Sequence, residues 1–172
     1  VQGTLASESG FTADLDIQLN PEGGVSVAID SVIDGKQGVQ ALAETLVGWP
    51  DLLTVDSGNA RLSMEVSTGQ GGELAASGSV ELQDVGGVFN RTAVSGLTGQ
   101  VRGSLENSRI TTRFRDMTVG EINAGIPVTS VLFSGNYSAP VTELLAGTLE
   151  VQQARARFLE GTLRVPPARY DL

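Results

Sequence analysis

The stretch GTLEVQQARARFLEGTLRV, residues 147–165, alternates apolar and polar side chains over nearly its whole length. Successive side chains of a β-strand point to opposite faces of the sheet, so this period predicts strands with one apolar face. Glu160-Gly161 interrupts the pattern at a position suited to a turn, and we therefore predict two strands that meet there. The apolar members of the stretch are Leu149, Val151, Ala154, Ala156, Phe158, Leu163 and Val165.

The same alternation recurs along most of the chain and predicts antiparallel hairpins joined by glycine-containing turns. Two glycine-rich runs, at residues 69–73 and 95–99, lead into strands and are predicted to be turns rather than phosphate-binding loops, which require a helix to follow. The sequence thus predicts a mainly β fold with about nine or ten strands. The other alternating segments are residues 15–19, 25–29, 62–66, 74–82, 101–105, 110–114 and 128–133.

One segment follows a helical period instead. Its apolar residues are spaced i, i+3, i+4, i+7 and i+8, which predicts one amphipathic helix around residues 39–48 that ends before Trp49-Pro50. A shorter helical turn is predicted at residues 141–146, between Pro140 and Gly147.

The length of 172 residues suits a single domain with a sizeable core, so we expect one β-rich domain over residues 1–172. The given sequence begins and ends within segments whose pattern is typical of strands. We therefore expect this domain to be a fragment of a longer protein.

The residue types exclude most catalytic chemistry. The chain has no cysteine and no histidine, which excludes disulfides, Ser–His–acid relays and nearly all zinc or haem sites. Asp14 and Asp16 occupy alternate positions of a predicted strand and lack the glutamate of a calcium loop, so we interpret them as a solvated face. We expect no metal, no cofactor and no enzyme; a hydrolase with a paired-carboxylate cleft is the weakest alternative.

Charge is distributed unevenly. The net charge is −9, with 13 acidic and 2 basic side chains in residues 1–90 and 7 acidic and 9 basic in residues 91–172. The overall sign argues against nucleic-acid binding. Arg113 and Arg115 flank Phe114, and Arg155 and Arg157 flank Ala156, so these arginines are predicted on the face opposite the apolar one. A basic band of this kind attracts acidic phospholipid headgroups or a partner protein, or else is an ordinary solvent-facing surface.

The C-terminal half resembles a known family. The segments VSGLTGQVRGSLENSRITTRFRDMTVGEINAGIPVTSVLFSGNYSAP (residues 94–140) and AGTLEVQQARARFLEGTLRVPPARYDL (residues 146–172) are similar to the C-terminal region of YdbH-like proteins. These are AsmA-like bacterial proteins that bridge the inner and outer membranes of Gram-negative cells. The same region is also labelled a dicarboxylate-transport domain, but no inward-facing cluster of cations in this sequence supports that chemistry.

The resemblance implies that the chain is the C-terminal part of a longer periplasmic protein. It also implies a curved antiparallel sheet that forms a U-shaped trough. Its apolar floor would carry phospholipid acyl chains, an N-terminal transmembrane helix would anchor the full-length protein in the inner membrane, and a small outer-membrane lipoprotein would dock on the C-terminal sheet edge. The alternative is a structural or interaction β-sandwich whose apolar face is a closed core. For the trough, the predicted lining residues are Val101, Leu105, Ile110, Phe114, Leu149, Val151, Phe158, Leu163 and Val165.

Overall fold

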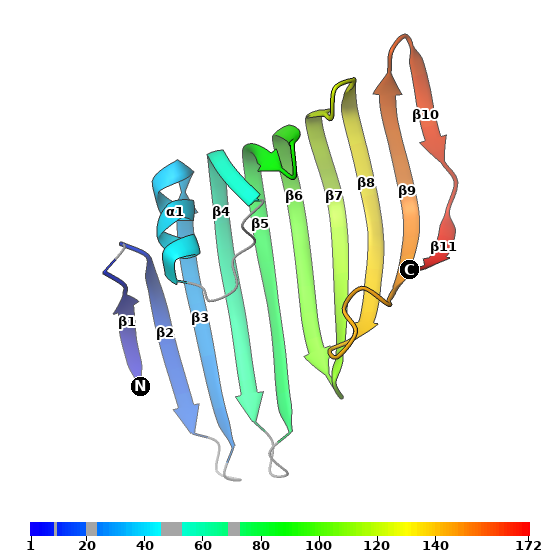
Figure 1. Ribbon diagram of the computed structural model, residues 1–172. Helices are drawn as coiled ribbons and strands as arrows, with labels where there is room; N and C mark the ends of the chain where they lie inside the picture. The colour runs from blue at the N-terminus through cyan, green and yellow to red at the C-terminus, as the bar shows by residue number, and fades with distance from the viewer. Residues whose placement is uncertain (9, 20–23, 46–52, 69–72) are drawn as a thin grey trace.

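The computed structural model describes residues 1–8, 10–19, 24–45, 53–68 and 73–172. Its strands form one antiparallel sheet in which neighbours in sequence are neighbours in space, from β1 to β10, and β11 pairs with β9 (Figure 1). The eleven strands are β1 (Gln2–Ala6), β2 (Thr12–Leu19), β3 (Val25–Asp34), β4 (Leu53–Thr68), β5 (Leu74–Phe89), β6 (Thr92–Glu106), β7 (Arg109–Asn123), β8 (Pro127–Pro140), β9 (Thr148–Phe158), β10 (Gly161–Val165) and β11 (Ala168–Asp171). The predicted mainly β fold is therefore confirmed.

Tight turns keep the long strands in register. Strands β4 to β8 have 14 to 16 residues each, well above the usual five or six. Asn90-Arg91 joins β5 to β6 and Asn107-Ser108 joins β6 to β7, and all four residues have positive φ angles between 44° and 70°. Two-residue turns with this backbone match the twist of the flanking strands. The predicted turn at residues 69–73 falls largely outside the described residues.

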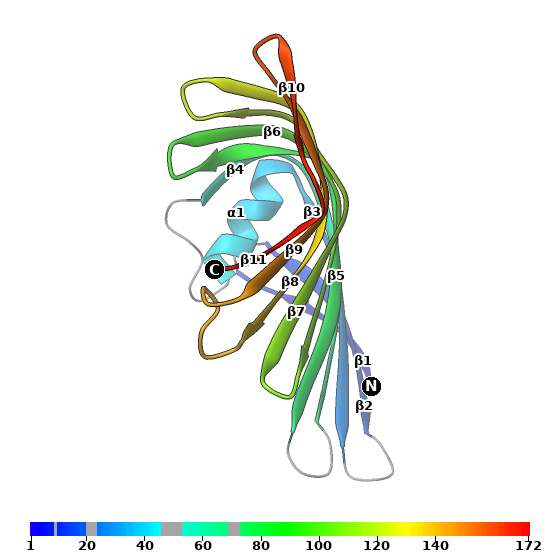
Figure 2. The same ribbon diagram turned by 90° about the vertical axis from the view of Figure 1, so that its right-hand side faces the viewer.

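Bulges bend the strands into a curved sheet, which Figure 2 shows from the side. The predicted turn at residues 95–99 is wrong, because these residues lie inside β6, where Gly96 and Gly99 have φ angles of 66° and 150° next to register shifts. Glycine at these two positions adopts the backbone conformation of a β-bulge and does not form a turn. A bulge in β9 opposite Ser134-Gly135 also explains why the apolar period of residues 147–165 moves from odd to even positions after Val151.

Helix α1 (Gly35–Thr45) lies on the concave face of the curved sheet, against β3 and β4 (Figure 2). It begins four residues earlier than predicted, and residues 46–48 of the prediction lie outside the described residues. A Cβ atom at Gly38 would lie 3.2 Å from Cγ2 of Ile33, so the absence of a side chain allows close packing of the helix on β3. We call the face that carries α1 the concave face, and the opposite one the convex face. Within the described ranges, no helix has the length and apolar character needed to cross a bilayer.

The predicted helical turn at residues 141–146 is wrong. The segment forms successive turns, in which the Glu143 amide donates to the Pro140 carbonyl and the Ala146 amide to the Glu143 carbonyl, both at 3.1 Å. The Tyr137 hydroxyl donates to the carbonyl of Leu144. Helices this short are unstable without tertiary support, and here the tertiary contact favours the turns.

The sheet is open. The accessible surface is 11346 Å², whereas about 8,000 Å² is expected for a compact monomer of this mass. Among the described residues there is no second sheet against the concave face, and no large side chain is fully buried. The predicted closed sandwich requires such a second layer, so the structure contradicts that alternative. The buried apolar residues are Ala13, Ile33, Ala41, Met117, Ala139, Val151 and Ala156.

Candidate functional site: an apolar furrow on the concave face

Three ladders of directly opposed residues cross strands β4 to β7 on the concave face. Residues directly opposite each other on neighbouring strands share a face, so each ladder follows from the strand register. Two of the ladders are bulky: Leu62, Val80, Val101 and Phe114 form one, and Val66, Ala76, Leu105 and Ile110 form the other. Between them lies a ladder of Met64, Gly78, Gly103 and Thr112.

The middle ladder forms the bottom of a furrow. Gly78 and Gly103 lie directly opposite each other and have no side chains, so the surface is hollowed between the two bulky ladders. The resulting depression has a volume of about 320 Å³. It runs across the strands, from β4 to β7. We call it the apolar furrow; it is lined by Leu62, Met64, Ala76, Ser77, Gly78, Ser79, Val80, Val101, Gly103, Ser104, Leu105, Ile110 and Thr112.

The two glycines at the bottom of the furrow differ in the space around them. A Cβ atom at Gly78 would lie 2.9 Å from the Ser63 carbonyl oxygen, so close backbone approach explains glycine at this position. Among the atoms of the described residues, a Cβ atom at Gly103 would have only the Thr111 carbonyl oxygen within 4 Å, at 3.9 Å. Packing within the protein therefore does not require glycine at position 103, although glycine inside a strand costs about 0.5–1 kcal/mol.

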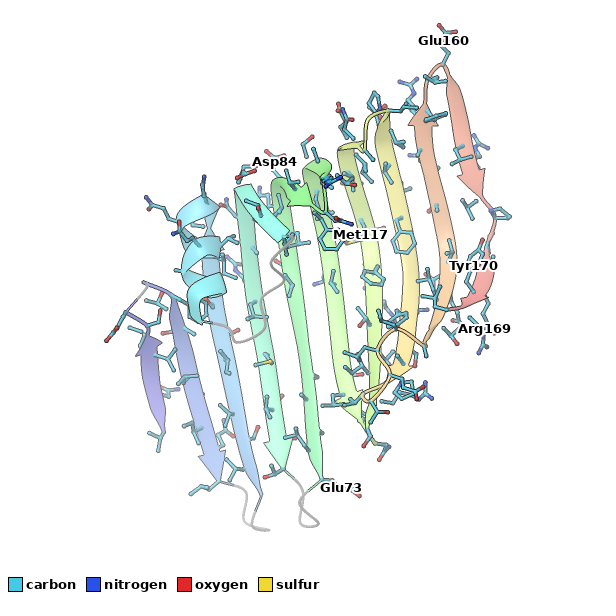
Figure 3. The ribbon with its side chains drawn as sticks, viewed as in Figure 1. Glu73, Asp84, Met117, Glu160, Arg169 and Tyr170 are labelled. Carbon is cyan, nitrogen blue, oxygen red and sulfur yellow. The ribbon has the colours of Figure 1, made fainter. Side chains whose placement is uncertain are left out.

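Aromatic side chains continue the concave surface beyond the furrow. The rings of Phe114 and Phe133 are tilted by 58° with centroids 5.6 Å apart, a favourable edge-to-face arrangement. Next to them, Met117 is buried at a bulge near the middle of β7 (Figure 3). Opposite Phe114 on β8 lies Gly135, where a Cβ atom would come within 2.5 Å of the Glu150 carbonyl oxygen.

All nine residues predicted to line a trough lie on the concave face. Val101, Leu105 and Ile110 line the furrow, and Phe114 belongs to one of its bulky ladders. The other five residues lie on β9 and β10, away from the furrow. Among these, Phe158 is 41% exposed and Leu163 is 59% exposed. The structure thus brings four of the nine together at the hollow and places five along the same face.

The sequence analysis missed the part of the furrow that β4 and β5 contribute. These residues were recognised as strand positions but were not assigned to a site. A signal was present, because Gly78 and Gly103 fall on the apolar phase of their strands, and glycine within a strand often marks a position where another molecule approaches closely. The missed residues are Leu62, Met64, Ala76, Gly78, Val80 and Gly103.

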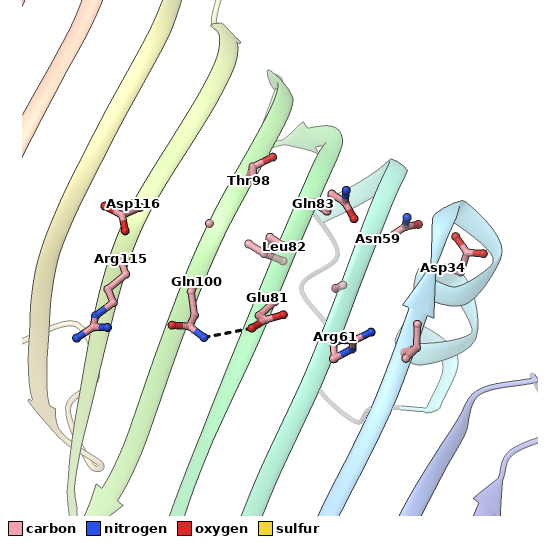
Figure 4. Close-up of a pocket in the computed structure, with 13 residues that line it drawn as sticks. Asp34, Asn59, Arg61, Glu81, Leu82, Gln83, Thr98, Gln100, Arg115 and Asp116 are labelled. Carbon is pink, nitrogen blue, oxygen red and sulfur yellow. Dashed lines mark hydrogen bonds between the residues drawn. The ribbon is translucent and has the colours of Figure 1, made fainter.

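The convex face is polar and carries charges of both signs. One depression on this face, about 860 Å³, includes the carboxylates of Asp34 and Glu81 and the guanidinium groups of Arg61 and Arg115 (Figure 4). Gln100 Nε2 donates to Glu81 Oε1 at 3.4 Å. Mixed charges of this kind suit water and ions, so this depression is a poor site for an apolar ligand.

The clustered charges predicted from the sequence also lie on the convex face. Asp14 lies directly opposite Asp30 near the β1 end of the sheet, in agreement with a solvated surface. The two arginine pairs are on β7 and β9, separated by β8. In the part of the chain that the structure describes, no three acidic residues gather in a way that could hold a metal ion.

An open, curved antiparallel sheet with an uncovered apolar face defines a β-protein that presents a groove. A comparison with family models gives the specific family: the model "YdbH-like: Intermembrane phospholipid transport protein YdbH" matches residues 30–172. The chain therefore belongs to the YdbH-like family, and the resemblance noted in the sequence is confirmed. No curated protein and no solved structure matched the chain.

Membership indicates a general role. The family is one of intermembrane phospholipid transport proteins, which supports a role in lipid transport and implies a location in the periplasm. The match begins at residue 30, so it also covers part of the N-terminal half, beyond the segments in which the resemblance was noted.

Proposed function

We propose that this chain is a segment of a lipid-transfer bridge whose concave face carries phospholipid acyl chains between the inner and outer membranes. The polar headgroups remain in water at the open side of the trough. The observation that carries the proposal is the apolar furrow itself, because no described residue covers it and none fills the space at its bottom beside Gly103.

The chemistry of the furrow suits an acyl chain. Burying a methylene group contributes about 0.8 kcal/mol, so a dozen half-buried methylenes contribute on the order of 5 kcal/mol. The lining is almost entirely aliphatic, and such a surface holds hydrocarbon without selecting a particular length or position. Weak, non-specific binding allows a lipid to move along the face instead of remaining at one site.

The direction of the furrow suits transfer over a distance. Adjacent strands are about 4.8 Å apart, so the path from β1 to β10 extends over roughly 43 Å. The nine residues predicted from the sequence, from Val101 on β6 to Val165 on β10, would extend the lipid path toward the C-terminal edge. The carrier role needs no catalytic group and no cofactor, and we propose that the chain is not an enzyme.

We also propose how the segment is connected at its ends. It would form the C-terminal part of a longer protein that is anchored in the inner membrane. A small outer-membrane lipoprotein would add a strand to the outer edge of β10, which has no neighbouring strand among the described residues. Residues Gly161 to Arg164 are exposed, and Pro166-Pro167 separates β10 from β11, so the open edge is short.

Filling the furrow tests the acyl-chain proposal. In Gly103→Ile, a branched side chain enters the furrow without meeting backbone atoms, and isoleucine is favourable in a strand. Native mass spectrometry of the purified chain should detect bound phospholipid in the unmodified protein and much less in the variant. The control is Thr111→Ile, which places the same side chain on the convex face, directly opposite Ser104 and outside the furrow lining, and should retain the lipid.

Photo-crosslinking provides a second readout. A photoreactive phenylalanine analogue at Phe114 or Phe158 should capture phospholipid, whereas the same analogue at Arg113 should not. Equal capture from both faces, or unchanged lipid content in folded Gly103→Ile, would contradict the proposal.

A further inference from the structure

One corner of the sheet projects apolar side chains into solvent. The β7–β8 turn and the β9–β10 turn lie at the same end of the sheet (Figure 1). Val128 lies directly opposite Phe158, so the two turns are close neighbours. Ile126 in the first turn is 56% exposed, and Leu159 in the second is 79% exposed. Phe158, next to Leu159, is also exposed.

Leu159, the first residue of the β9–β10 turn, has a backbone conformation that is unusual for leucine. The corresponding two-residue turns after β5 and β6 begin with Asn90 and Asn107, which tolerate positive φ angles well. Leu159 has a φ of 53°, a conformation that costs a residue with a Cβ roughly 1 kcal/mol or more. Its exposure means that internal packing does not explain leucine at this position. Asparagine or glycine would form the same turn at lower cost.

Three exposed arginines lie directly behind these turns on the convex face. Arg155 is directly opposite Arg164 on β10, and Arg157 is two residues along the same strand from Arg155. Like charges directly opposite each other destabilise a sheet. The ion pairs found among the described residues involve the N-terminus, Lys36 and Arg169, and none of these three arginines. Their charge is therefore not neutralised within the described part of the chain.

We propose that this corner, formed by Ile126, Phe158, Leu159, Arg155, Arg157 and Arg164, binds the surface of a membrane leaflet that contains anionic phospholipid. The apolar tips enter the interfacial region while the guanidinium groups contact headgroup phosphates. This is a direct contact of the sheet with a membrane, and it is distinct from the carriage of acyl chains in the furrow.

The shape of the corner favours a membrane over an acidic protein. A specific protein interface needs a complementary surface of about 1,000 Å² or more. The apolar residues here are instead on separate turns that project beyond the sheet. A fluid leaflet adapts to projecting tips, and each basic residue close to an anionic surface contributes about 1 kcal/mol.

Glu160 is the acidic residue closest to the proposed contact. It follows Leu159 and lies at the outermost point of the β9–β10 turn (Figure 3). Its carboxylate would oppose an anionic surface, so the proposal predicts a gain of binding in Glu160→Gln, by about fivefold. A merely destabilised turn would not produce such a gain.

Sedimentation with vesicles tests the proposal. The 172-residue chain should bind phosphatidylcholine vesicles that contain about one third phosphatidylglycerol, and bind less to vesicles of phosphatidylcholine alone. Combined Arg155→Glu and Arg164→Glu should weaken binding by at least about thirtyfold. Leu159→Ser should weaken it by about tenfold. The control Arg61→Glu makes the same charge change on the convex face of β4, far from the corner, and should leave binding nearly unchanged.

Several outcomes would overturn the proposal. Equal binding to both vesicle types would exclude the proposed contact. So would unchanged binding in the arginine variants once circular dichroism has verified that they are folded. Polyglutamate serves as a soluble competitor that stands in for an acidic protein. If it displaces the chain from vesicles at a concentration of negative charge below that of the phosphatidylglycerol, the corner would be assigned to an acidic protein. Lipid carried in the furrow is measured separately by native mass spectrometry, so failure here would leave the transport proposal intact.

Discussion

Two regions of the concave face have the same sequence pattern and different surroundings. Under α1, Ile33 on β3 is only 6% exposed, and Ala41 of the helix is buried with it. In the furrow, Val101 on β6 occupies the same phase of its strand but is only half-buried. An alternating strand therefore specifies an apolar face, while the element that covers this face decides whether it becomes core or groove.

The largest expected effect compares these two residues. Ile33→Ala should lower the free energy of unfolding by about 3 kcal/mol, because it leaves a cavity beneath α1. Val101→Ala should cost below about 1 kcal/mol, since its surroundings are already partly solvent. Urea unfolding monitored by circular dichroism measures both. Equal losses would mean that the furrow is covered in solution, which would remove the distinction between the regions.

A smaller effect is expected for two glycines within the open region. Gly135→Ala should destabilise by about 2 kcal/mol, because its Cβ atom would approach the Glu150 carbonyl to 2.5 Å and push β8 from β9. Gly103→Ala should be neutral, or stabilising by up to about 1 kcal/mol. Thermal unfolding of the two variants distinguishes a glycine required by the backbone from one that only keeps the furrow empty. A large loss at Gly103 would contradict that assignment.

The smallest effect concerns polar groups on the same face. Ser31 is buried near α1, and its hydroxyl donates to the Thr12 carbonyl at 2.7 Å, so Ser31→Ala should cost about 1 kcal/mol. Thr112 lies at the bottom of the furrow, and Thr112→Val should change stability by less than about 0.5 kcal/mol. The denaturant midpoints of the two variants test this expectation, provided that the slope of unfolding free energy against denaturant concentration is the same in both. A cost at Thr112 as large as that at Ser31 would indicate a buried hydrogen bond in the furrow.

Much of the sheet was predictable because strand formation is a local property. Residues 147–165 predicted two strands meeting at Glu160-Gly161, and β9 and β10 end and begin at Phe158 and Gly161. Periodicity placed the candidate residues of each regular strand segment on one face. In β9 the bulge opposite Ser134-Gly135 then keeps Phe158 on the same face as Leu149 and Val151. Bulges were harder to predict. The run at residues 95–99 has the glycines of a turn, but long strands on both sides keep it within β6.

The furrow could not be predicted in full because it depends on register. Gly78 and Gly103 are 25 positions apart, and only the pairing of β5 with β6 places them opposite each other. The start of α1 at Gly35 was also missed, because Gly35 and Gly38 are poor helix formers and the contact of Gly38 with Ile33 is tertiary.

By itself, the sequence determined that the chain is mainly β, that one face of its strands is apolar, and that histidine and cysteine chemistry is absent. It also contained the family resemblance. Only the tertiary structure decided that the apolar face stays open and where it is hollowed. The physical reason is that alternation reports which side of a strand avoids water, whereas the presence of a covering layer depends on contacts between distant segments.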